Sequence, residues 1–86
     1  MIQGKLQSGF EYKIEESVLD NMELLDLIVE VDKNPLVISK VVKMLLGEEQ
    51  RNRLYDHLRT EKGNVPVLKV SEEVAEIFNG SHQGKN

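Results

Sequence analysis

The stretch Asn34-Pro-Leu-Val-Ile-Ser-Lys-Val-Val-Lys-Met-Leu-Leu-Gly47 decides how this chain folds. Proline forces the preceding residue out of helical geometry but is favoured as a first helical residue, and the Asn34 side chain can cap the helix. Gly47 accepts a positive φ without strain and marks the end. The stretch therefore predicts a helix over 35–46. Its inward side chains are expected to be Ile38, Val41, Val42, Leu45 and Leu46, with Lys40 and Lys43 outward.

Residues 17–33, upstream of this helix, also show helical periodicity. Ser17 can cap the segment, or Asp20 and Asn21 can cap it one turn later. We expect a broad apolar arc to face the core, with acidic residues on the opposite side. The arc consists of Val18, Met22, Leu25 and Val29, widened by Leu24, Ile28 and Val31, and the opposite side carries Glu16, Asp20, Glu23 and Glu30.

The first fifteen residues show a different hydrophobic periodicity from the helical segments that follow. Phe10, Tyr12 and Ile14 alternate with charged residues, which is typical of a half-buried strand. Ser8 and Gly9 are turn residues. The pattern predicts a β-hairpin over 1–15, and it must lie on the helices because an isolated hairpin is marginally stable in water.

Two further helices are expected after Gly47. Acidic residues open a helix over 48–61, whose narrow apolar stripe is Leu54, Tyr55 and Leu58. Pro66 and its β-branched neighbours disfavour helix, so residues 65–70 should run extended or as an irregular turn. A last helix over 71–79 should follow, capped by Ser71 and closed by Gly80. Residues 81–86 are expected to form a flexible tail. The predicted fold is mainly α, with a small N-terminal β-hairpin and a bundle of about four short helices in one domain over 1–80.

Composition limits the classes of function. The 86 residues carry a net charge of −4 and no cysteine, which excludes disulfides and thiolate metal sites. The N-terminus lacks the apolar run of a signal peptide, and no apolar stretch is long enough to span a membrane. We therefore expect a cytoplasmic protein with no membrane partner.

The residue types that form catalytic or metal sites do not occur in any recognisable motif. His57 and His82 have no partner at metal-ligand spacing, and no glycine-rich loop resembles a phosphate-binding loop. Carboxylates spread along one helix cannot converge on a single ion. We expect no catalytic residue, no metal and no cofactor, so the protein is predicted not to be an enzyme.

Charge is divided between two blocks. Residues 15–32 contain seven acidic residues and no basic one, whereas residues 33–69 contain eight basic and four acidic residues. The blocks can attract each other or form solvated faces, or the acidic helix can face a basic partner. A helix-turn-helix over 35–60 is a further alternative, with Arg51, Arg53 and Arg59 on phosphates, although Glu48 and Glu49 at the start of the recognition helix oppose it.

Leucines among the acids suggest a docking surface. Leu19 and Leu27 fall on the acidic side of the 17–33 helix, next to Glu23 and Glu30, and Tyr55 belongs to a narrow stripe that leaves it partly exposed. A leucine surrounded by acids suits a basic amphipathic helix. The alternative is that both leucines pack under the hairpin or a neighbouring helix.

Several stretches resemble a known family. These are Leu45-Leu-Gly-Glu-Glu-Gln-Arg-Asn-Arg-Leu-Tyr-Asp-His-Leu-Arg59, Gly63-Asn-Val-Pro-Val67, Val70-Ser-Glu-Glu-Val-Ala-Glu-Ile-Phe78 and the opening Gly9-Phe-Glu-Tyr-Lys-Ile14. They are similar to the short tail assembly chaperones of long-tailed bacteriophages of Gram-positive hosts. The resemblance covers nearly the whole chain and rests on caps and core positions.

The resemblance implies a function. Members of that family bind the tape measure protein in the host cytoplasm, keep it soluble until the tail tube forms around it, and are absent from the finished virion. Many also exist in a longer, frameshifted form, and Gly84-Lys85-Asn86 permits a slippery codon sequence. The partners implied are the tape measure protein, the frameshift-extended form and further copies of the chain. The alternatives are a small DNA-binding regulator and another small protein-binding module.

Overall fold

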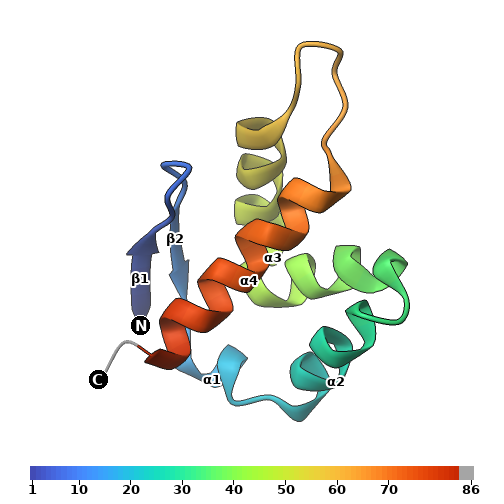
Figure 1. The fold of residues 1–86 in the computed structure, drawn as a ribbon. Helices are drawn as coiled ribbons and strands as arrows, with labels where there is room; N and C mark the ends of the chain where they lie inside the picture. Colours follow the sequence, from blue (N-terminus) through green and yellow to red (C-terminus); the bar gives the residue numbers. More distant parts are fainter. Residues whose placement is uncertain (84–86) are drawn as a thin grey trace.

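The computed structural model describes residues 1–83 and confirms a mainly helical fold with an N-terminal hairpin. The helix α3 lies at the centre, and β2, α2 and α4 all pack against it (Figure 1). The opening stretch of α3 therefore organises the rest of the chain. The elements are β1 (Ile2–Lys5), β2 (Glu11–Ile14), α1 (Glu16–Leu19), α2 (Met22–Val31), the 3-10 helix η1 (Pro35–Val37), α3 (Ile38–Leu58) and α4 (Val67–Gln83).

The hairpin forms as its alternation predicts. The strands are antiparallel, with Ile2 opposite Ile14 and Gly4 opposite Tyr12. Phe10, Tyr12 and Ile14 are buried, while the charged residues between them are exposed. The turn is a three-residue loop that ends in Gly9 with φ 99°, which is a common hairpin connection.

A glutamine of α3 completes the second edge of β2. The backbone N–H of Lys13 donates to Gln50 Oε1 at 2.8 Å, and Gln50 Nε2 donates to the Lys13 carbonyl oxygen at 2.8 Å. The same amide nitrogen also donates to the Leu46 carbonyl oxygen. The amide thus pairs with β2 as a neighbouring strand would, and it joins the hairpin to α3.

The predicted 17–33 helix is two helices. Asp20 has φ −93° and ψ 58°, and Asn21 is extended, so the helical path is interrupted between α1 and α2. The Asn21 side chain accepts a hydrogen bond from the Glu23 N–H at 2.9 Å. Of the predicted caps Ser17, Asp20 and Asn21, it is Asn21 that starts the long helix, because its side-chain oxygen satisfies a free N–H of the first turn.

The predicted boundary at Gly47 is a sharp bend inside α3. Gly47 has φ 81° and ψ 168°, which is far from helical geometry, and the halves 38–46 and 48–58 run in different directions (Figure 1). The five residues expected to face the core from the first half are all buried. The second half ends at Leu58 rather than at residue 61, because Arg59 is already extended with ψ 134°.

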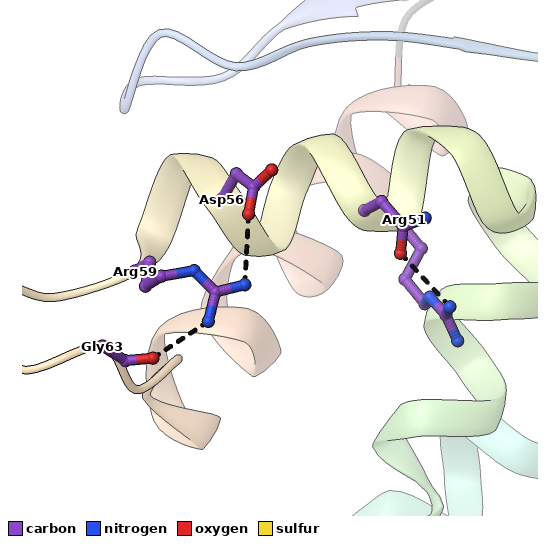
Figure 2. A network of polar contacts seen from close by, with 5 residues as sticks. Arg51, Asp56, Arg59 and Gly63 are labelled. Atoms are coloured by element: carbon purple, nitrogen blue, oxygen red, sulfur yellow. Dashed lines mark hydrogen bonds and ion pairs between the residues drawn. The ribbon is translucent and has the colours of Figure 1, made fainter.

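The connection between α3 and α4 repeats the hairpin turn. The N–H of Thr60 donates to the Asn64 carbonyl and that of Gly63 donates to the Thr60 carbonyl, as Leu6, Gly9 and Phe10 do in the hairpin. The Arg59 guanidinium braces this loop, with one nitrogen 3.1 Å from Asp56 Oδ1 and another 2.9 Å from the Gly63 carbonyl oxygen (Figure 2). These bonds hold the loop where it projects from the bundle.

The last helix is longer than predicted at its start. α4 begins at Val67, so the non-helical segment expected over residues 65–70 is wrong for residues 67–70, and the Ser71 cap is wrong. Pro66 stands just before the helix, where its missing N–H is not required, and its carbonyl oxygen accepts the Val70 N–H at 3.2 Å. Burial of Val70 outweighs the small helix penalty of a β-branched residue.

The predicted end of the last helix is also wrong. α4 continues through Gly80 to Gln83, because glycine permits a left-handed conformation but does not require one. Residues 81–83 of the expected flexible tail are therefore helical, and the backbone of His82 belongs to α4. The rest of that tail prediction, residues 84–86, lies outside the described residues.

Side chains from every layer meet in one core. They come from the hairpin, α2, both halves of α3, and α4. The hairpin turn is also tied to α4 by polar contacts, because the Gln7 N–H donates to Glu76 Oε2 at 3.0 Å and the Ser8 hydroxyl donates to Glu73 Oε1 at 2.7 Å. The buried apolar residues are Leu6, Phe10, Tyr12, Ile14, Leu24, Ile38, Val41, Val42, Leu45, Leu46, Leu54, Val70, Val74 and Ile77.

Candidate protein-binding surface

The outer face of α2 carries exposed apolar side chains. Met22, Leu25 and Val29 are 65%, 40% and 62% exposed. The prediction that these three face the core is wrong. The core side of α2 is instead formed by buried Leu24 and by the half-buried side chains of Leu27, Ile28 and Val31.

The three exposed residues form one stripe. They are spaced three and four residues apart, so they lie one above another along the helix, and we call them the α2 stripe. At about 100° per residue, Asp26 and Glu30 lie along one side of the stripe and Asp32 along the other. All three carboxylates are exposed. The result is an apolar strip with negative charge on both flanks.

The predicted partner-binding residues differ in exposure and do not all lie on one surface. Glu23 and Glu30 are exposed on α2, whereas Leu19 and Leu27 are half-buried and pack against the core. Tyr55 is half-buried on the second half of α3, which points away from α2 (Figure 1), and its ring centroid is 5.7 Å from Arg51 Cζ. Binding by these five residues stays a prediction, and the structure does not bring Tyr55 to the other four.

The α2 stripe had a signal in the sequence. Seven of the ten α2 residues are apolar. A surface helix needs fewer apolar residues than this to form its single buried face. The surplus indicates an exposed apolar strip. Periodicity alone cannot say which of the two arcs is buried, because the neighbouring α3 decides that.

Ser8, His57 and Glu73 meet at the hairpin turn. The Ser8 hydroxyl donates to Glu73, and His57 Nε2 is 3.0 Å from the Ser8 carbonyl oxygen and 3.2 Å from Ser8 Oγ. A carbonyl oxygen only accepts, so His57 Nε2 carries the proton. In a nucleophilic triad the histidine accepts the serine proton and the acid orients the histidine. Here the serine lies between the other two, so the cluster ties the hairpin to α3 and α4.

The arginines of the helix-turn-helix alternative do not share a face. Arg51 and Arg53 are both on α3 but point about 160° apart at 100° per residue. Arg51 lies over Tyr55, Arg53 Cζ is 5.3 Å from the Phe10 ring centroid, and Arg59 holds the loop after α3 (Figure 2). Their charges are therefore spread over three surfaces instead of one phosphate-binding face.

Among the side chains of residues 1–80, no group of three or more histidine or acidic residues is placed to hold a metal ion. None of the helices in residues 1–83 is both long and apolar enough to cross a membrane. Exposed apolar side chains also occur at Leu36 (85%) and in the first turn of α4, at Val67 (58%) and Leu68 (70%).

Comparison of the chain with protein-family models, with characterised proteins and with solved structures finds no match. Among the described side chains, the α2 stripe is the most extended exposed apolar surface on a single helix face.

Proposed function

We propose that this protein is a binding protein that covers apolar helical surfaces of another protein, and that its partner is the tape measure protein of a bacteriophage tail. The observation that carries the binding role is the exposure of Met22, Leu25 and Val29 on α2. Fixing large apolar side chains outward on a small domain has a solvation cost, and a partner that covers them removes it.

The carboxylates beside the α2 stripe favour a basic partner. Asp26, Glu30 and Asp32 border the stripe, so an amphipathic helix with lysine or arginine beside its apolar face is complementary to it. A tape measure protein is a long helical rod with exposed apolar faces, and the resemblance to tail assembly chaperones supports it as the partner. Binding would keep the rod soluble in the host cytoplasm until the tail tube encloses it.

Co-expression with any tape measure protein that the neighbouring genes encode tests the proposal. We expect the wild-type chain to keep that protein in the soluble fraction and to be recovered with it in a pull-down. Val29→Lys places a cation in the apolar strip and should weaken the complex about tenfold or more, because burial of a valine contributes about 1.5–3 kcal/mol.

Val67→Lys is the matched control. Val67 is a valine of similar exposure, but it is the first residue of α4 and lies outside the α2 stripe. The same change there should leave binding unchanged. If the wild-type chain does not bind the tape measure protein, the proposed partner is wrong. If both lysine variants bind as the wild type does, the α2 stripe is not the binding surface.

A further inference from the structure

A second apolar feature adjoins the α2 stripe. α2 and α4 both pack on α3, and a groove of about 360 Å³ lies between them. Its floor is Ile38 and Val41 of α3, and its walls include Val31 of α2 and Val74 and Phe78 of α4. An engineered cavity of about 150 Å³ holds a benzene ring, so this groove has room for one large apolar side chain.

The polar residues at the groove are acidic or neutral. Asp32, directly after α2, and Glu72 of α4 line it and are both exposed, and among the described side chains no lysine or arginine lines it. In the part of the chain that the structure describes, neither carboxylate takes part in an ion pair. A cationic residue beside an inserted apolar side chain would therefore meet two unpaired acids.

The groove and the α2 stripe form one continuous surface. Ile28, which lines the groove, is three residues after Leu25, and Asp32 is three residues after Val29. Residues three apart are neighbours on a helix. A partner that covers the stripe thus reaches the groove over apolar surface, with Asp32 at the border.

We propose that the groove receives a large apolar anchor side chain of the bound helix, next to a lysine or arginine of that helix which pairs with Asp32 and Glu72. This inference rests on the proposed function, because the stripe is what brings the helix to the groove. Ile28, Val31 and Phe78 in the groove lining are only half-buried, so an inserted anchor side chain would add dispersion contacts to them. A second copy of the chain fits less well, since its own α2 would bring acids against acids.

Synthetic amphipathic peptides test the inference without the natural partner. Each peptide has about 18 residues, long enough for a helix to form on binding, with leucine at helical spacing, lysine elsewhere, and Phe, Leu or Ala at one central apolar position. Binding is measured by fluorescence anisotropy. We expect the Phe peptide to bind the wild-type chain about tenfold or more tightly than the Ala peptide, because central buried anchors dominate such interfaces.

Ala75→Trp fills the groove from the exposed side of α4. It should reduce the difference between the Phe and Ala peptides to less than about twofold. Leu68→Trp is the matched control, because it adds a similar ring at an exposed α4 position outside the groove. It should preserve the full difference. Circular dichroism of both variants establishes that the fold is retained.

The outcomes separate the two proposals. If Ala75→Trp preserves the preference for Phe while Val29→Lys weakens all peptides, the groove inference is wrong and stripe binding stands. If the wild-type chain binds none of the peptides, or binds them without regard to the central residue, the anchor inference is wrong, while the tape measure co-expression still decides the proposed function. If sedimentation shows self-association that Ala75→Trp abolishes, the occupant is a second copy and the inference is overturned.

Discussion

Replacing Gly47 by alanine tests the bend on which the bundle depends. The glycine has φ 81° and ψ 168°, in a region that is essentially restricted to glycine and that costs other residues about 1–3 kcal/mol. A Cβ atom added at Gly47 meets nothing within 4 Å. The whole effect of Gly47→Ala should therefore come from the backbone, as a destabilisation of about 1–3 kcal/mol.

Thermal unfolding followed by circular dichroism measures this effect. For a domain of this size about 1 kcal/mol shifts the Tm by roughly 4–8 °C, so we expect a decrease of about 5–20 °C. Denaturant unfolding should show a lower midpoint with little change in slope, because the variant alters stability rather than the surface exposed.

Gly80→Ala is the matched control with the opposite expected sign. Gly80 lies within α4 without a positive φ, and its added Cβ also meets open space. Alanine there should stabilise the protein by about 0.5–1 kcal/mol. A D-alanine at position 47, introduced by chemical synthesis, should be tolerated, because mirror-image geometry allows it a positive φ. An unchanged or raised Tm for Gly47→Ala with L-alanine, together with increased helicity, would mean that α3 is straight and that the bend is wrong.

Three further predictions concern the contacts that hold the elements together. Gly4→Ala should destabilise the hairpin by about 1–3 kcal/mol, since its Cβ would lie 2.5 Å from the Tyr12 hydroxyl oxygen and displace a buried ring; a chemical denaturation curve equal to that of the wild type would contradict this. Asn21→Ala removes the α2 cap and should cost about 1 kcal/mol, whereas Asn21→Asp should retain most of the stability in the same assay. Gln50→Ala removes both hydrogen bonds to the Lys13 backbone and should lower the free energy of unfolding by about 1 kcal/mol. Hydrogen exchange at the Lys13 amide should become faster, and an unchanged exchange rate would refute the pairing.

The sequence predicted the structure best where neighbouring residues along the chain allow only one local conformation. The alternation of Phe10, Tyr12 and Ile14 placed β2 correctly, and Asn34 caps the 3-10 turn that leads into α3, with its side chain accepting the Leu36 N–H. The Gly47 boundary was correct as a change of direction. At Asn34 and Gly47 a single residue supplies a hydrogen bond or accepts a positive φ, so neighbours in space matter little there.

The prediction failed where tertiary contacts decide between local alternatives. α2 has two apolar arcs, and only the position of α3 determines that Leu24 is buried while Val29 is exposed. Pro66 is compatible with both a helix start and an extended segment, and Gly80 with both a helix end and a helix interior. The groove between α2 and α4 could not be predicted either, because its residues come from three helices that are distant in sequence.

The polar ties between the hairpin turn and α4 have a consequence for the order of synthesis. Gln7 and Ser8 are made early, but their partners Glu76 and Glu73 follow 69 and 65 residues later. While the ribosome is still translating α3, the hairpin has neither these acids nor the α4 side of its core. The hairpin turn therefore gains its last polar contacts only after α4 has emerged.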